Sequence, residues 1–346
     1  MLVLTRQDTA VMKGIAICAM LCHHLYGFPP EGVEPYTGVL SWLGVLGKVC
    51  VALFLFCSGY GLAANYTPNS IKEDLKFIGR RLLKFYLNYW VIFLIFVPIT
   101  ILAFNRPLSA AYGENYVWGH LILDIFGLQG WNSYNITWWF NTLIIILYLL
   151  FPLLYRAIRW KPWLAILVGV IVMRLSTRVP FDTLDLCLWQ FPFILDVVWK
   201  LYESKGADVQ EWLTTHRAIA IICSVCLLIA SVIIRMYPIV PHWGGVRIDG
   251  FIACAIAWCV ITILRNSRSI MAILYFLGKH SINSYMIHTF INGYWHPEWL
   301  HSCEWLRGGA NFAILMLICL KISIVLEYIK EKVGLNKLMK LLTNRI

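Results

Sequence analysis

The chain has 346 residues, of which 60% are hydrophobic and only 14% are charged. Soluble domains carry about 25% charged residues, so this composition excludes an ordinary soluble protein and indicates an integral membrane protein. The net charge of +11 does not indicate nucleic-acid binding, because the Lys and Arg residues lie in short loops between apolar segments rather than on one soluble module.

Repeated apolar segments of about 20 residues are long enough to cross the ~30 Å hydrocarbon core as helices. The predicted fold class is therefore an all-α, polytopic integral membrane protein with about ten transmembrane helices. We expect one transmembrane domain over residues 1–346, without an appended soluble domain. The predicted spans are 10–27, 39–63, 83–104, 136–155, 162–179, 187–203, 217–236, 249–265, 270–293 and 309–329.

The distribution of Lys and Arg between the loops predicts the orientation of these spans. With the N-terminus in the cytoplasm, 20 basic residues fall on the cytoplasmic side and 6 on the outer side. Both termini are therefore expected in the cytoplasm. The expected location is the cell membrane, meaning the inner or plasma membrane.

Lys13 and His24 stand out in the first apolar segment, VMKGIAICAMLCHHLYGF, because they are 11 positions apart. This spacing puts both side chains on one helix face to within about 20°, separated by roughly 16 Å along the axis. Ionisable residues inside a membrane usually face a protein interior or a cavity. His23 lies about 80° off that face, so the spacing favours His24 as the functional histidine.

Arg80, Arg81 and Lys84 lie where the inner loop 66–82, which is amphipathic, enters the third span. Their cationic groups would suit the phosphates of an acyl-CoA. The alternative is ordinary cytoplasmic positive charge with contacts to anionic lipid. The sequence leaves both interpretations open.

Polar residues within other spans have a structural and a functional interpretation. Ser58 lies in Ser58-Gly59-Tyr60, where small residues favour a close helix crossing and contact with substrate is the alternative. Tyr285 and His288 are three positions apart and neighbour one another on a helix, so a hydrogen bond between them is the simplest interpretation. Binding of the donor or substrate is the functional one.

Other residues raise narrower expectations. Lys48 and Lys279 lie inside predicted spans and need a partner, and the candidates are Asp196, Asp249, aromatic faces or a bound ligand. Trp138, Trp139 and Phe140 are predicted as interfacial anchors, and Asn141 just beyond them could orient a substrate. The side chains predicted on the outer side that could bind sugar hydroxyls are Glu31, Glu114, His120, Asp124, Asp182 and Asp185.

Metal binding is not predicted. Most of the 11 Cys lie inside apolar segments and are expected to be small buried hydrophobic residues. Cys223 and Cys226 form a C-x-x-C pair, but no second pair and no nearby His accompany them.

Five stretches, in this order, resemble the membrane-bound acyltransferase-3 family, the O-acyltransferases of cell-surface glycans. MKGIAICAMLCHH is similar to the first helix of that family, a basic residue and a His with ten residues between them, although Lys13 stands where Arg is usual. FLFCSGYGLA resembles the family's F-x-x-S-G signature. The other three stretches are GRRLLKFYLNYW, TWWFNTLIIILYLLFPLL and LGKHSINSYMIHTFI. The resemblance runs from about residue 10 to about residue 290.

The resemblance implies an O-acyltransferase, in the first instance an O-acetyltransferase. It would take acetyl groups from acetyl-CoA, a co-substrate rather than a tightly bound cofactor, and pass them to a hydroxyl of a glycan or glycolipid. His24 would be the catalytic base, because an imidazole accepts protons near neutral pH. The residues expected to bind donor or substrate are Lys13, Ser58, Arg80, Arg81, Lys84, Tyr285 and His288.

Three alternatives stay open on the sequence. The protein could be a transporter or flippase for a lipid-linked sugar, although no internal repeat of the kind found in many transporters is evident. It could transfer succinyl or a longer acyl group. It could also be a non-catalytic membrane partner in a polysaccharide-synthesis complex.

Overall fold

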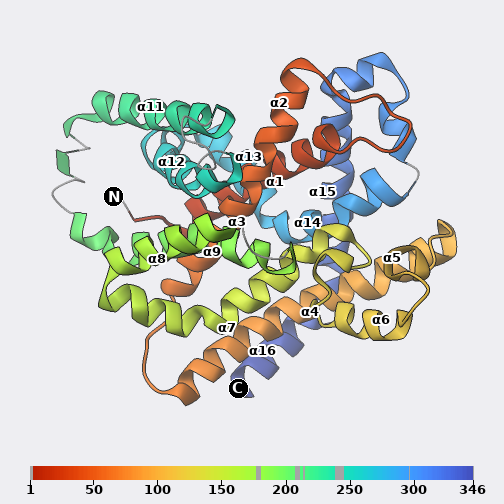
Figure 1. Ribbon diagram of the computed structural model, residues 1–346, viewed down its shortest axis with the longest axis horizontal. Coiled ribbons are helices and arrows are strands. Elements are labelled where there is room, and N and C mark those ends of the chain that lie inside the picture. Colours follow the sequence, from red (N-terminus) through yellow and green to blue (C-terminus); the bar gives the residue numbers. More distant parts are fainter. Residues whose placement is uncertain are drawn as a thin grey trace. The chain divides into compact units, whose positions relative to one another are not determined.

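The computed structural model describes residues 3–176, 181–206, 211–212, 215–237, 245–295 and 297–345, and within these ranges it consists of helices, turns and loops (Figure 1). The α-helices are α1 Arg6–Gly27, α2 Gly38–Leu46, α3 Cys50–Ala63, α4 Ile71–Ala103, α5 Ser109–Tyr112, α6 Val117–Ile125, α7 Trp139–Trp160, α8 Pro162–Leu175, α9 Phe181–Tyr202, α11 Arg217–Met236, α12 Asp249–Thr262, α13 Arg268–Lys279, α14 Ser281–Thr289, α15 Asn311–Lys332 and α16 Leu335–Arg345. A π-helical turn, Phe290–Tyr294, follows α14, and a second one, Leu306–Ala310, precedes α15.

Seven helical segments among the described residues are long and apolar enough to cross a membrane. They correspond to seven of the ten predicted spans, and the other three predicted spans have a different form. Helix α8 has only 14 residues, α9 has 22 residues with Pro192 inside it, and the span predicted at 270–293 is divided between α13 and α14. The last three positions of the span predicted at 162–179 lie outside the described residues. Ten spans with both termini inside the cell stay a prediction.

Helix α4 joins two segments that the sequence separates into an amphipathic loop and a span. It runs for 33 residues without a break. The Ser70 hydroxyl caps it by accepting a hydrogen bond from the Glu73 backbone N–H at 3.3 Å, and the acidic Glu73 and Asp74 favour a helix N-terminus. The basic positions 80, 81 and 84 therefore lie inside a helix.

The chain divides into two compact units, each assembled from separate stretches of sequence. The first unit comprises residues 1–20, 47–67 and 152–281, and the second comprises 21–46, 68–151 and 282–346. Helix α1 contributes its first half, with Lys13, to the first unit and its second half, with His24, to the second.

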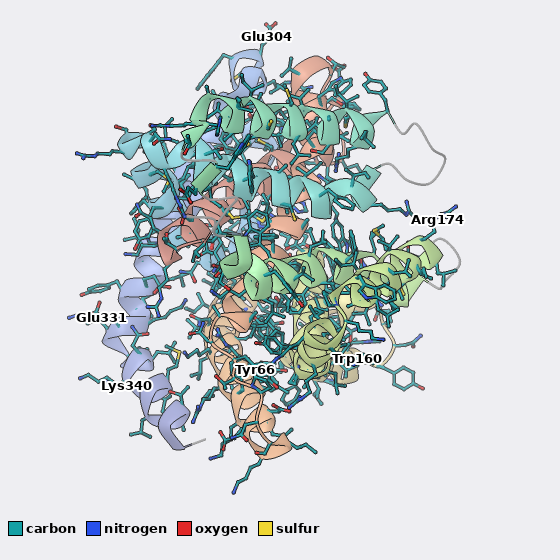
Figure 2. The ribbon with its side chains drawn as sticks, turned by 90° about the vertical axis from the view of Figure 1, so that its left-hand side faces the viewer. Tyr66, Trp160, Arg174, Glu304, Glu331 and Lys340 are labelled. Carbon is teal, nitrogen blue, oxygen red and sulfur yellow. The ribbon has the colours of Figure 1, made fainter. Side chains whose placement is uncertain are left out.

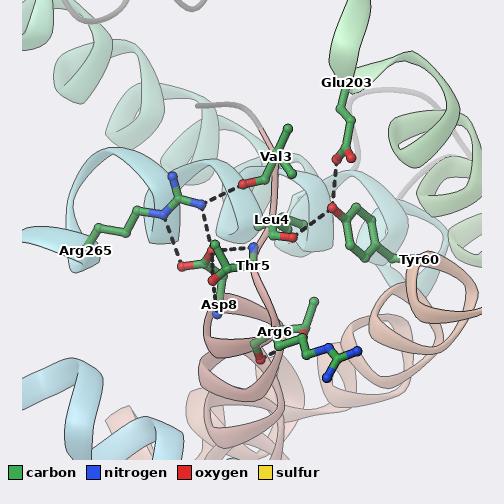
Figure 3. Close-up of polar contacts among 9 residues, drawn as sticks. Val3, Leu4, Thr5, Arg6, Asp8, Tyr60, Glu203 and Arg265 are labelled. Atoms are coloured by element: carbon green, nitrogen blue, oxygen red, sulfur yellow. Dashed lines mark hydrogen bonds and ion pairs between the residues drawn. The ribbon is translucent and has the colours of Figure 1, made fainter. Parts of the chain in front are cut away.

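An ion pair holds the N-terminal segment within the first unit (Figure 3). The Arg265 guanidinium donates to both Asp8 carboxylate oxygens, at 2.6 and 3.1 Å, and to the Val3 carbonyl at 2.7 Å. Thr5 and Asp8 form a reciprocal cap: the Thr5 backbone N–H donates to the Asp8 carboxylate at 2.7 Å, and the Asp8 N–H donates to the Thr5 hydroxyl at 3.1 Å. The start of α1 is thereby fixed against the segment that follows α12.

Tyr60, from the Ser-Gly-Tyr sequence, completes this contact region. Its hydroxyl lies 2.9 Å from the Leu4 carbonyl and 2.8 Å from the Glu203 carboxylate (Figure 3). Lys200 pairs with Glu203 and also lies over the Tyr60 ring, 5.2 Å from its centroid. The aromatic residue of this sequence therefore connects α3 to the N-terminal segment and to the end of α9.

The two lysines that lie inside predicted spans, Lys48 and Lys279, have the kinds of partner that the sequence analysis left open. Asp185 and Asp249 act on Lys48 at electrostatic range. Asp249 also accepts a hydrogen bond from Arg235 Nε at 2.5 Å, and both of those side chains are buried. Lys279 lies 5.9 Å from the centroid of the Tyr275 ring, within the range of a cation–π contact.

Helices α3 and α9 approach closely where Gly59 faces Asp196. The Asp196 side chain is fully buried. A Cβ atom added at Gly59 would lie 2.1 Å from Asp196 Oδ1, closer than any non-bonded contact allows. The expectation of a close helix crossing at Ser58-Gly59-Tyr60 is therefore confirmed, and the glycine is needed to make room for a carboxyl group.

Gly59→Ala is expected to destabilise the protein by about 1–3 kcal/mol, the usual cost of overpacking a core. Adding Asp196→Ala should recover part of that loss, because the second change removes the atoms that the new methyl group meets. Thermal unfolding of the detergent-purified protein measures both effects. Gly61→Ala on the same helix is the control, since no atom lies within 4 Å of a Cβ there. A double variant no more stable than Gly59→Ala alone would contradict this explanation.

Candidate functional site

His24 lies in the second unit near the end of α1 and is partly exposed. Its ring is surrounded by other rings. The centroid of the His288 ring lies 4.8 Å away at an interplanar angle of 52°, that of His23 5.0 Å away, and that of Phe28 6.0 Å away. The fold thus brings together two of the predicted site residues, His24 and His288, that are more than 260 positions apart in the chain.

His23 has a structural role that its neighbour does not share. It is buried, and its Nδ1 atom lies 2.7 Å from the Gly44 carbonyl oxygen, which can only accept a hydrogen bond. Gly44 itself lies against α1, since a Cβ there would be 2.7 Å from the Gly27 nitrogen. His23 therefore fixes α2 to α1, whereas His24 is the more accessible of the two imidazoles.

The two predicted residues of α14 do not bond to one another through their side chains. His288 Nδ1 lies 2.7 Å from the backbone carbonyl of Tyr285. The Tyr285 hydroxyl lies 2.8 Å from the Thr137 carbonyl and 3.3 Å from the side-chain oxygen of Asn141. The expected hydrogen bond between these two residues is therefore present, with the Tyr285 backbone carbonyl as its acceptor, and the Tyr285 hydroxyl bonds with another element.

A short turn before α7 anchors α14 through several hydrogen bonds. Asn135 Nδ2 and Trp138 Nε1 both donate to the Met286 carbonyl, at 3.3 and 3.1 Å. Asn141, on the first turn of α7, is fully buried, and its Nδ2 atom has no hydrogen-bond partner in the described structure. The turn therefore fixes the position of the helix that carries His288.

The same contacts correct the expectation for the aromatic residues 138–140. Trp138 is completely buried and Trp139 is 6% exposed, so these two rings belong to the core. The Trp138 ring packs against Tyr89 and Phe290, with centroids 5.0 and 5.7 Å away. A buried indole is tolerated here because its N–H has a carbonyl partner.

The predicted basic residues of the second unit lie along α4. Arg80 and Lys84 are exposed, and Arg81 is half-buried. Arg80 Nε donates to the Thr343 carbonyl of α16 at 3.2 Å. Arg81 lies over the Phe77 ring, 5.4 Å from its centroid. Helix α16 contacts α4 and adds further cationic side chains, among them Lys340 (Figures 1 and 2).

Lys330 is a buried cation that the sequence analysis counted only as a loop charge. It is 2% exposed, and its Nζ donates to Asn88 at 2.9 Å, Asn283 at 2.7 Å and Glu327 at 2.9 Å. These contacts connect α15 to α4 and α14. Its spacing of three residues from Glu327 is the one signal in the sequence for this arrangement.

Lys13 and Ser58 belong to the first unit. Both are partly buried. Lys13 and Asp196 both act at electrostatic range on Cys57, the residue before Ser58. In the first unit, then, Lys13 lies close to the segment of α3 that contains the Ser-Gly-Tyr sequence.

Asp124, one of the side chains expected to meet sugar hydroxyls, is instead a structural centre. It is fully buried and accepts hydrogen bonds from the Tyr112 hydroxyl at 2.7 Å, the Tyr134 backbone N–H at 2.6 Å and the Tyr89 hydroxyl at 3.2 Å. Burial raises the pKa of Asp124, while these donors act in the opposite direction. Of the other candidates, His120 is hydrogen-bonded to Gln129, and the side chain of Asp182 lies outside the described residues.

The comparisons with known proteins agree on one activity. The profile of a family described as an acyltransferase domain, Acyltransferase 3, matches residues 10–328. A protein named acyltransferase MdmB, from Streptomyces mycarofaciens, is 26% identical over 349 residues, which cover 88% of this chain and 84% of that protein. No solved structure matches the chain.

Proposed function

We propose that this chain, which belongs to the acyltransferase-3 family, is an O-acetyltransferase that moves an acetyl group from acetyl-CoA to a hydroxyl of a cell-surface polysaccharide or glycolipid. Family membership and the apolar helices establish the coarser statement that it is a membrane acyltransferase. The donor, the acceptor and the cell membrane as its location belong to the proposal.

The setting of His24 carries the proposal. Transfer of an acyl group to a hydroxyl needs a base that takes the hydroxyl proton, and a neutral imidazole is suited to that step near pH 7. His24 is partly exposed and lies among three rings. Of the two adjacent histidines, His24 is the one that is not buried against a carbonyl of α2.

The basic residues of α4 support acyl-CoA as the donor. Coenzyme A carries several phosphate groups, and guanidinium groups bind phosphate oxygens through paired hydrogen bonds. Arg80 and Lys84 are exposed on one turn of α4, with Arg81 beside them. Lys13 belongs to the other unit and stays a separate candidate for binding the donor.

The reaction we propose breaks the thioester C–S bond and forms an ester C–O bond. The acceptor hydroxyl loses its proton to His24 as its oxygen attacks the acyl carbonyl carbon. The coenzyme A thiolate leaves and takes up the proton that His24 gives back, which returns the imidazole to its neutral form. The reaction therefore needs no redox partner, and its products are an O-acetyl ester and coenzyme A.

Purified protein in lipid nanodiscs, incubated with acetyl-CoA and glycans from cells that lack the gene, is expected to release coenzyme A thiol and to add one acetyl group per modified hydroxyl. Mass spectrometry of the glycan measures the addition. Release of coenzyme A thiol from succinyl-CoA but not from acetyl-CoA would still support an acyltransferase, with succinyl in place of acetyl as the transferred group. No release from any acyl-CoA, together with vesicle uptake of a lipid-linked sugar, would overturn the proposal in favour of a transporter.

A further inference from the structure

The second imidazole of the site, His288, is completely buried although it lies against His24. Donor or substrate binding by His288 stays a prediction. Its burial and its contacts favour a role that acts through its neighbours.

The hydrogen bonds of His288 define one tautomer. Its Nδ1 atom lies 2.7 Å from the Tyr285 carbonyl oxygen, and because a carbonyl only accepts, Nδ1 carries a hydrogen. In the neutral ring Nε2 is then the acceptor, and the Thr289 hydroxyl lies 3.2 Å from it. Both nitrogens are satisfied, which is the pattern of a neutral imidazole with a fixed orientation.

The Thr289 hydroxyl donates its single hydrogen to Nε2 of His288, the ring nitrogen that carries no hydrogen. The Thr137 hydroxyl lies 3.1 Å from Thr289 Oγ1, but it donates its own hydrogen to the side-chain oxygen of Asn135 at 2.8 Å, so it is a polar neighbour of Thr289. Asn135 also accepts from the Thr137 backbone N–H at 3.1 Å. Asn135, Thr137 and Thr289 are all buried.

We propose that His288 is a positioning residue for His24, and that the Thr289 hydroxyl, by donating to Nε2, fixes the tautomer and orientation of His288. The inference rests on the proposed function, in which His24 takes the acceptor proton. A neutral, immobile ring against His24 restricts how the His24 imidazole can rotate. It also places no second positive charge beside that imidazole when it takes up the proton.

This arrangement differs from plain packing in what it requires. Packing needs a ring of the right size at position 288 and any apolar group at position 289. Positioning through a fixed tautomer needs a ring nitrogen at 288 and a hydroxyl at 289, which serine also supplies. Removing the hydroxyl while keeping the side-chain volume therefore separates the two explanations.

Thr289→Val in the full-length protein is expected to lower kcat by about 10-fold to 100-fold, the rate equivalent of one lost buried hydrogen bond. KM for acetyl-CoA should stay unchanged, because the buried Thr289 is proposed to act through His288. Thr289→Ser should restore kcat to near the wild-type value. His288→Phe, which keeps a ring but no ring nitrogen, should lower kcat at least as much as Thr289→Val.

Thr142→Val is the matched control. Its hydroxyl also makes two hydrogen bonds, to Gly127 and Gly130, on α7 of the same unit. The Thr142→Val variant should lose about as much stability as Thr289→Val and should keep the wild-type kcat. Equal losses of kcat in Thr142→Val and Thr289→Val, or no recovery in Thr289→Ser, would reduce His288 to a packing residue and overturn the inference. If the His24→Ala variant still transferred the acyl group, the proposed role of His24 would be wrong, and this inference would fail with it. If His24→Ala were inactive but the Thr289 and His288 variants were fully active, the inference alone would fail.

Discussion

Replacing His24 by Asn should reduce acyl transfer by about 100-fold to 10,000-fold, the contribution of a positioned general base. The protein should still fold, because His24 is only partly buried at the end of α1. The amide of Asn keeps a polar group at the position but does not accept a proton near neutral pH. Coenzyme A release by the purified variant, normalised to its abundance in the membrane, measures the effect.

The adjacent histidine supplies the matched control. His23→Asn retains a side-chain N–H close to the position of Nδ1, so the hydrogen bond to the Gly44 carbonyl can still form. We expect this variant to keep most of the specific activity and to lose some thermal stability. If both Asn variants lost activity equally, the assignment of the base to His24 would be wrong.

Gly278→Ala is expected to have the largest effect on stability. A Cβ at Gly278 would lie 1.8 Å from the Ala10 backbone oxygen, and one at Gly14 would lie 2.1 Å from the Leu274 oxygen, so α1 and α13 cross with their backbones in contact. A backbone atom cannot rotate away as a side chain can. The two helices must separate, which should cost about 3 kcal/mol or more, at or above the top of the usual overpacking range.

The midpoint of thermal unfolding in detergent, followed by loss of monodisperse protein, measures the effect of Gly278→Ala. Gly119→Ala on α6 is the control, since nothing lies within 4 Å of a Cβ at that position. It should be neutral or slightly stabilising, because Ala favours a helix over Gly by about 1 kcal/mol. A Gly278 variant as stable as this control would show that the crossing can relax.

The fold class followed from the sequence because apolar segments of bilayer length leave few alternatives. The exact helix boundaries did not follow. Helix α13 ends at Lys279, inside the span predicted at 270–293, and α4 continues through the expected boundary between the loop 66–82 and the third span. The hydropathy of the sequence marks neither feature. The burial of Trp138 was missed for the same reason: an aromatic residue near the end of a span suits an interface until a carbonyl partner is found in the core.

The candidate site was predicted in part. Helical spacing separated His24 from His23, and the structure gives the physical basis, a carbonyl of α2 bound to His23. The surroundings of Thr137 and Thr289 and the role of Lys330 could not be predicted, because each of these residues has a neighbour or partner more than 100 positions away in the chain. Single hydroxyls and terminal lysines carry no periodic pattern that marks them as buried.

The contact between Gly59 and Asp196 restricts the order in which these two positions can change during evolution. A larger residue at position 59 meets the carboxyl group directly, whereas a smaller residue at position 196 only leaves space. A lineage that replaces both must therefore lose the acid first, and the glycine becomes free to vary only afterwards. The residues allowed at one position therefore depend on the residue at the other, although the two are 137 positions apart in the chain.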